Sequence, residues 1–370
     1  MPGKLQFRHY TGEEVEREAR IDDEEFPAGE FLMARTVWLE DGPELRQHRP
    51  AGGSQRHDGY ERLDSEILAG RRLYEVADWG NYPPEVARLY GDEAASADPY
   101  SLFEPYHGQP LREVGRYIID DEFDAFLVSL LTGLCWLAAA GVAHRAINPD
   151  SVLWDGQRRR AQITDFSRST LFGVRRTPVT GSPEWIPKEQ RSRTLYGNAG
   201  PRDDVWAAGR LIFFVRNQGE ELVRRSQLTD SGLDGLFGGL FDQVFGPPEG
   251  RPTAWDLLEH GLHKRSPVLP AADGSARLIA GRGRFLEARQ RRHHGAVVPR
   301  DFNADIDWMG EPGGAAPAPD TSPGTSTAQS AASELAGGQA GETRAGPGPQ
   351  ADDRTSETGR TRQFPWRRGD

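Results

Sequence analysis

Acidic and imidazole side chains gather in the loop-rich stretch between residues 143 and 201, where they could do chemistry. His144 opens the segment HRAINPDSVLW, and Asp165 lies in the segment ITDFSRS. A carboxylate such as Asp165 could hold a divalent cation, because protein sites bind Mg²⁺ through one or two carboxylates. His144 has no His or Cys companions at metal-ligand spacing, so the sequence predicts no transition-metal site there.

Five short segments follow one another in an order that is more specific than any one of them alone. They are HRAINPDSVLW, ITDFSRS, GSPEWIPKE, DDVWAAG and RPTAWDLLEH, and they begin at residues 144, 163, 181, 203 and 251. Together they resemble the C-terminal lobe of the protein-kinase family, in particular bacterial Ser/Thr protein kinases, with a catalytic loop, a D-F-G metal motif and an A-P-E motif. LFEPYHGQPL, at 102–111, resembles the hinge between the lobes and offers Glu104 and Tyr106 to a cofactor.

The resemblance implies an α+β, two-lobed protein-kinase-like fold, with a small β-rich N-lobe, a larger α-helical C-lobe and a disordered C-terminal tail. It also implies structural roles for residues that keep the family's types: His144, Arg145, Glu189, Asp204 and Arg251. Glu189 resembles the A-P-E carboxylate and is expected to pair with Arg251, since burying either charge alone costs about 3 to 5 kcal/mol. Asp204 resembles a buried aspartate that accepts backbone N–H bonds from the catalytic loop.

The positions that would carry phosphoryl transfer are replaced. Ala146 stands where the family has the H-R-D aspartate, so no general base remains at that point. Asn148 replaces a lysine, and Ser151 replaces the asparagine that helps to hold a second magnesium ion. Asp165 survives in Asp-Phe-Ser and could hold one metal ion. Asp150 could stand in as the base, although a solvent-facing loop residue is the favoured interpretation.

The lysine and glutamate that clamp ATP in kinases have no full counterpart here. The chain has three lysines, Lys4, Lys188 and Lys264, and none fits the clamp. Arg46 is the best positional match for a partner of Glu66, but its planar fork does not replace a compact ammonium. The phosphate-covering loop has one glycine, Gly29, among five acids: Asp22, Asp23, Glu24, Glu25 and Glu30. We therefore expect ATP binding in the usual pose to be disfavoured.

These losses predict a pseudokinase, a binding or allosteric regulatory module that contacts another protein, such as a kinase or a regulated enzyme. It would require no cofactor, while weak ATP and Mg²⁺ binding stays open. The alternative is an atypical or weak Ser/Thr kinase, or a nucleotidyl transferase, that uses Asp165 for its metal ion. Thr177, Thr180 and Ser182 lie where an activation segment would be phosphorylated, beside Arg175 and Arg176.

The elements that must position these residues can be read from the patterns around them. Residues 31–49 predict a hairpin, 60–73 an amphipathic helix, and 83–91 and 99–108 two short strands. Helical signals dominate from residue 120, and the uncharged stretch 126–143 is expected to be a buried core helix rather than a membrane span. We predict a kinase-like N-lobe at 1–107, with its first 20 or so residues uncertain, a C-lobe at 108–300 and a disordered tail at 301–370.

Composition excludes several classes of function. The net charge of −11 disfavours attraction to nucleic acid or to an anionic membrane. The single cysteine, Cys135, excludes an intrachain disulfide framework and is expected to be a buried thiol. The N-terminus shows no secretory signal, so a cytoplasmic location is expected. Three lysines against 42 arginines indicate a GC-rich bacterial genome.

Overall fold

The computed structural model describes most of the chain up to residue 267. The described residues are 2–52, 56–77, 81–176, 183–191, 197–224 and 226–267. The chain divides into two compact units, Met1–Gly314 and Ala315–Asp370, and all described residues belong to the first. The tail at 301–370 and the three phosphorylation candidates Thr177, Thr180 and Ser182 lie outside the described residues.

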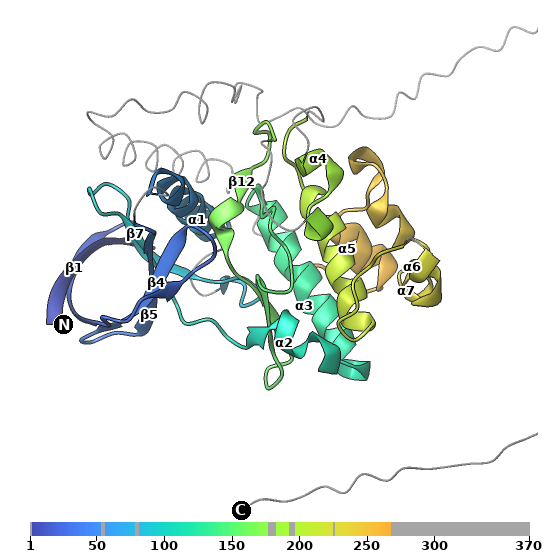
Figure 1. Ribbon diagram of the computed structural model, residues 1–370, viewed down its shortest axis with the longest axis horizontal. Coiled ribbons are helices and arrows are strands. Elements are labelled where there is room, and N and C mark those ends of the chain that lie inside the picture. The colour runs from blue at the N-terminus through green and yellow to red at the C-terminus, as the bar shows by residue number, and fades with distance from the viewer. Residues whose placement is uncertain are drawn as a thin grey trace, which may run out of the picture. The chain divides into compact units, whose positions relative to one another are not determined.

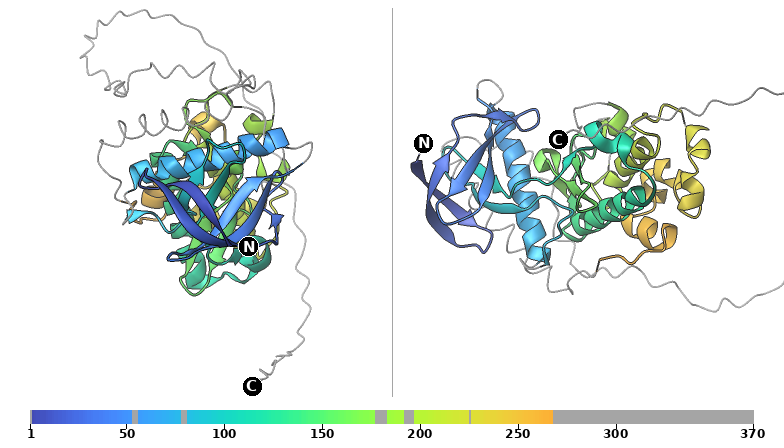
Figure 2. Two further views of the ribbon diagram at one scale, coloured as in Figure 1. Left: turned by 90° about the vertical axis from the view of Figure 1, so that its left-hand side faces the viewer. Right: turned by 90° about the horizontal axis from the view of Figure 1, so that it is seen from below.

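The N-terminal part of the chain is a closed barrel of six antiparallel strands (Figures 1 and 2). Around the barrel the strands follow the order β1, β2, β4, β5, β7, β6, and β6 pairs with β1 again. Their bounds are Pro2–His9, Glu14–Ile21, Leu32–Leu39, Glu44–Pro50, Tyr100–Phe103 and Leu89–Glu93 in that order, and the short β3, Phe26–Pro27, pairs with β4. Alternate apolar residues such as Leu5, Val37 and Leu102 fill the interior.

The expected fold class is wrong for this part of the chain, because a closed barrel stands in place of a typical kinase N-lobe sheet. Strand β1 pairs on one side with β2 and on the other with β6, with His9 opposite Gly91, and β2 also pairs with β4. Closure requires a partner far along the chain, which no local pattern reveals. Charged side chains such as Glu14, Glu16 and Glu18 alternate along β2 and lie outside the apolar core, so the hydrophobic signal of this strand is weak.

Tight packing surrounds His9 at the end of β1, where the barrel closes. Its ring lies 3.8 Å from that of Tyr10 and 5.0 Å from that of Tyr90, and its Nδ1 lies 3.0 Å from the Thr11 hydroxyl. Burial lowers the pKa of His9 below its ordinary value of 6.5. The folded state therefore favours the neutral ring, and this contribution to stability is present above that value and is lost as pH falls through the folded pKa.

We expect the melting temperature of the protein to fall, relative to that of a His9→Phe variant, as pH is lowered from about 7.5 to about 5. The phenylalanine keeps the aromatic packing and removes the titration. Thermal unfolding at several pH values measures the difference, and His263→Gln, which changes an exposed histidine, is the control. Parallel pH profiles of the wild type and His9→Phe would contradict the prediction.

Helix α1, Arg56–Val76, contains the helix expected at 60–73 and lies between the barrel and the helical part of the chain (Figure 2). The hairpin expected at 31–49 is formed by β4 and β5, and the strands expected at 83–91 and 99–108 correspond to the shorter β6 and β7. Leu63 and Ile67 are fully buried on α1, as their helical spacing predicts. The boundaries at 107/108 and 300/301 stay predictions.

The helical part, residues 111–267, is built around α3, Asp120–Ala139, and α5, Asp203–Arg216. The remaining helices are short: α2 Leu111–Val114, α4 Lys188–Arg191, α6 Ser226–Asp230, α7 Leu233–Leu236 and α8 Ala254–Asp256. Single helical turns lie at Gly115–Tyr117, Phe166–Arg168, Pro183–Trp185, Asp242–Phe245, Pro248–Gly250 and Leu257–Gly261. Five short strands frame the loops: β8 Gln109–Pro110, β9 Val142–Ala143, β10 Val152–Asp155, β11 Arg160–Ile163 and β12 Thr170–Leu171.

Helix α3 carries most of the apolar stretch that raised the question of a membrane span. Among the described residues it is the one helix long and apolar enough to cross a membrane, and most of that stretch is buried inside the protein. Cys135 lies on its buried side, where burial raises the pKa of the thiol to about 12. Helix α3 packs against α5, α8 and β11, as a core helix does.

Candidate functional site

A cleft of about 510 Å³ lies where the barrel meets the loops of the helical part. Its walls come from the β3–β4 turn, from β5 and α1, from the segment after β7, and from the loops at 150–153 and 164–165. The side chains that matter below are Phe26, Gly29, Arg46, His48, Glu66, Tyr106, Asp150 and Asp165. The size suits a small organic ligand.

The loop from Ala146 to Ser151 closes on itself by hydrogen bonds. The Ser151 hydroxyl donates to the Ala146 carbonyl at 2.7 Å, and the Asn148 side-chain amide donates to the same carbonyl at 2.8 Å. The Asn148 backbone N–H donates in turn to Ser151 Oγ at 3.0 Å. Asn148 and Ser151, which the motif resemblance sets at the positions of a lysine and an asparagine, are therefore engaged with the loop itself, and Ala146 presents only a methyl group.

Asp204 holds the start of this loop from the N-terminal turn of α5. Its carboxylate accepts the backbone N–H groups of His144 and Arg145, each at 2.7 Å. Burial raises the pKa of Asp204, against the effect of these two bonds. The His144 Nε2 lies 2.8 Å from the Thr164 carbonyl, which links the loop to the strand that leads to Asp165. Burial also lowers the pKa of Arg145 to about 10.

Glu189, on α4, and Arg251 form a buried ion pair. Arg251 Nη1 donates to Glu189 Oε1, and Arg251 Nε donates to the Gly246 carbonyl at 3.0 Å. The two residues are the ones that the motif resemblance pairs. They lie outside the cleft, so their contribution is to the stability of the helical part.

Asp165 lies in the cleft but is engaged by its own turn. Its Oδ1 accepts the Ser167 hydroxyl at 2.6 Å and the Ser167 N–H at 3.3 Å. Gly29 lies beside it: a Cβ atom at Gly29 would be at ordinary van der Waals distance, 3.7 Å, from Asp165 Oδ2. Glu30 extends this contact, because it accepts a bond from Arg168 at 2.7 Å. The β3–β4 turn thus reaches over Asp165.

These donors do not fit the metal pair of a kinase. In the part of the chain that the structure describes, no three His, Cys, Asp or Glu side chains come together in a group that could hold a metal ion. Asp165 is a single carboxylate, and the Ser151 hydroxyl is turned to the Ala146 carbonyl. Mg²⁺ would have to rely on Asp165, water and a ligand's own oxygens.

His48, and not Arg46, is the partner of Glu66. His48 Nδ1 lies 2.9 Å from Glu66 Oε2, and the side chains are only 3% and 2% exposed. Arg46 Nε donates to His48 Nε2 at 3.0 Å. Residues 46 and 48 lie on the same face of β5, because side chains two positions apart on a strand point to the same side. The prediction of Arg46 therefore identified the correct face of the strand but was wrong by two residues. The spacing to Glu66 alone could not separate these two positions.

Three candidates remain: Asp150 and Tyr106, which line the cleft, and Glu104, which does not. Asp150 forms a two-bond ion pair with Arg112, at 2.6 and 2.7 Å, and both side chains are largely exposed. Glu104 Oε1 lies 3.6 Å from Arg88 Nη1. Glu104 does not line the cleft, whereas Tyr106 does. Burial raises the pKa of the Tyr106 hydroxyl.

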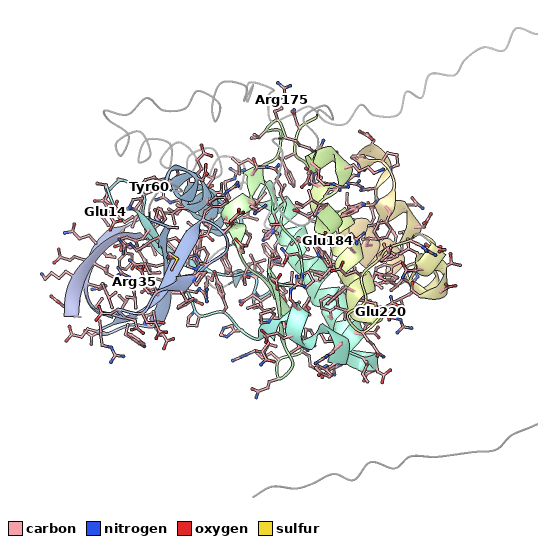
Figure 3. The ribbon with its side chains drawn as sticks, viewed as in Figure 1. Glu14, Arg35, Tyr60, Arg175, Glu184 and Glu220 are labelled. Atoms are coloured by element: carbon pink, nitrogen blue, oxygen red, sulfur yellow. The ribbon has the colours of Figure 1, made fainter. Side chains whose placement is uncertain are left out.

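The segment that would follow the Asp-Phe-Ser motif is described only in part. Arg176 forms a two-bond ion pair with Asp203, at 2.9 and 2.6 Å. Arg175 forms an isolated antiparallel β-bridge with Asn198. Figure 3 shows Arg175 where the described chain ends before the next gap. Arg176 is therefore already paired with a carboxylate.

Part of the chain is similar in sequence to known protein kinases. No family model matches it. The Serine/threonine-protein kinase STE20 of Saccharomyces cerevisiae is 28% identical over 138 residues, which are 36% of this chain and 14% of that protein. The Sperm motility kinase Z of Mus musculus is 29% identical over 36% of this chain and 27% of its own length.

A third relative, the Serine/threonine-protein kinase STE20 of Eremothecium gossypii, is 33% identical over 122 residues, which are 31% of this chain and 12% of that protein. In all three cases the matched stretch is less than a third of the relative's length. These matches support a protein-kinase-like relationship for this chain.

Proposed function

We propose that the chain is a kinase-related binding or regulatory module that does not carry out ordinary transfer of the γ-phosphate of ATP. The self-bonded loop from Ala146 to Ser151 is the observation that carries this proposal. A methyl group cannot accept the proton of an incoming alcohol, and the neighbouring polar side chains are spent on the loop. Asp150, the alternative base, is held by Arg112.

Magnitudes favour the same conclusion. A positioned general base contributes about 10²- to 10⁴-fold, and kinases turn over about 1 to 100 times per second. Loss of the base alone would leave seconds to hours per turnover. The cleft also replaces the ammonium that clamps ATP with the His48 imidazole, and such losses do not simply multiply when groups act as a unit.

The partner of such a module would be another protein, for example a kinase or an enzyme that it regulates. We propose that it contacts this partner through helix α1, the cleft and the segment from Asp165 to Glu189, of which residues 177–182 lie outside the described residues. The net charge of −11 supports a protein partner over nucleic acid or an anionic membrane. We propose a cytoplasmic protein that needs no cofactor.

We expect the full-length protein, incubated with γ-labelled ATP, Mg²⁺ or Mn²⁺ and a generic protein acceptor, to transfer no more label than its Asp165→Ala variant. Ala146→Asp alone should not create activity, because Glu66 is still bound to His48 and the loop is still bonded to itself. Label counting on the separated proteins measures the transfer.

Metal-dependent transfer that disappears in Asp165→Ala would contradict the proposal and favour a weak Ser/Thr kinase. Incorporation of label from α-labelled ATP would instead favour a nucleotidyl transferase. An active Ser/Thr kinase assayed in the same mixture shows that the acceptor and the label are competent.

A further inference from the structure

The guanidinium group of Arg46 lies in the cleft in contact with two aromatic rings. Its Cζ is 4.6 Å from the centre of the Phe26 ring and 4.9 Å from the centre of the Tyr106 ring. Both distances are in the range of cation–π contact. Phe26 comes from β3 and Tyr106 from the segment after β7, so Arg46 joins two walls of the cleft.

A chain of hydrogen bonds through His48 to the buried Glu66 also holds the Arg46 side chain in place. An arginine N–H can only donate, so His48 Nε2 must accept the bond from Arg46 Nε. The His48 ring then carries its proton on Nδ1 and donates it to Glu66 Oε2. Arg46 is thus oriented by a neutral histidine that is itself oriented by a carboxylate on α1.

We propose that Arg46 takes the place of a planar heteroaromatic ring, of the size of a purine base, and closes the cleft to such ligands. The guanidinium is flat and stacks on aromatic faces, as a base does. The cleft measures about 510 Å³ with Arg46 in place, and removing this side chain would add the space that it fills beside Phe26 and Tyr106. This inference rests on the proposed function, since both concern the same cleft, but it concerns binding rather than transfer.

The opposite end of the cleft disfavours the phosphates that such a base could carry. Gly29 packs against Asp165, and the Glu30–Arg168 ion pair ties the same turn to the segment after Asp165. Glu66, Asp150 and Asp165 line the cleft. Asp150 is paired with Arg112, so the carboxylates of Glu66 and Asp165 are the ones that would repel a phosphate. The site opened by loss of Arg46 should therefore prefer an uncharged nucleoside to a nucleotide.

The test compares Arg46→Ala with the wild type in the full-length protein, with adenosine and with ATP without metal as the probes. We expect adenosine to bind Arg46→Ala at least tenfold more tightly than the wild type, as stacking on two rings supplies. ATP should gain less than adenosine. Isothermal titration calorimetry and the ligand-dependent shift of melting temperature measure both.

Two variants guard the interpretation. Arg20→Ala removes an exposed arginine that stacks on Trp38 at 4.0 Å outside the cleft, and it should bind adenosine as the wild type does. Arg46→Lys keeps the charge without the flat fork and should gain affinity less than Arg46→Ala. Adenosine binding that is equal in the wild type and in a folded Arg46→Ala variant would overturn the inference, and so would no binding to a folded Arg46→Ala.

The outcome is separable from that of the proposed function. Phosphate transfer by the wild type would refute the proposed function without adenosine binding being measured. Absence of transfer together with unchanged adenosine affinity in Arg46→Ala would leave the proposed function standing and refute the role of Arg46.

Discussion

Replacing Glu189 with alanine is expected to lower the free energy of unfolding by about 3 to 5 kcal/mol. The substitution leaves the Arg251 guanidinium buried, and among the described residues the Gly246 carbonyl is then its remaining hydrogen-bond acceptor. An uncompensated buried charge costs more than the ion pair itself contributes, because its hydration is lost without return. Denaturant titration followed by circular dichroism measures the change.

The neighbouring Lys188 offers a matched control, because it lies on the same short helix and is exposed. Lys188→Ala should change stability by less than about 0.5 kcal/mol. Replacing both Glu189 and Arg251 with methionine should restore much of the loss, since neither charge then remains buried. If Glu189→Ala were as mild as Lys188→Ala, the ion pair would have no structural role.

Replacing Asp204 with alanine is expected to lower the free energy of unfolding by about 2 to 6 kcal/mol, since each orphaned buried donor costs about 1 to 3 kcal/mol. The two donors are the backbone N–H groups of His144 and Arg145. The backbone at Arg145 has a φ of 64°, a left-handed conformation that L residues avoid, so the loop needs this external support. Hydrogen exchange of these two amides should accelerate more than global stability alone predicts.

Two comparisons define that result. Asp204→Asn keeps one acceptor oxygen and should cost less than Asp204→Ala. Asp230→Ala, at an exposed site on α6, should leave both amides protected as in the wild type. Unchanged exchange at His144 and Arg145 in Asp204→Ala would show that the loop is held by other contacts.

Much of the candidate site follows from motif types in the sequence, because its groups lie in loops of fixed length. Ala146, Asn148 and Ser151 are close together in the chain, so their presence in one loop could be expected, while their replacement of catalytic positions stays a prediction. The contact between Asp204 and residues 144 and 145 spans a longer separation, and it followed from the resemblance rather than from any local pattern.

The barrel and the true partner of Glu66 could not be obtained in the same way. Strand β1 finds β6 only in three dimensions, and its alternating pattern fits any half-buried strand equally well. Arg46 and His48 differ by one strand repeat, and only the structure shows that the imidazole reaches Glu66 while the guanidinium contacts the Phe26 and Tyr106 rings. The contacts that Arg46 makes inside the cleft join residues from distant parts of the chain, so the spacing of residues in the sequence does not predict them.

The pairing of β1 with β6 has a consequence for how the chain is made. Strand β1 emerges from the ribosome before α1, whereas β6, which places Gly91 opposite His9, emerges only after α1 has been synthesised. The barrel therefore cannot be completed until that later stretch has left the exit tunnel. During this interval Arg8 and His9, the two residues of β1 that pair with β6, lack their partners on that side, and we expect the folding of the barrel on the nascent chain to be delayed accordingly.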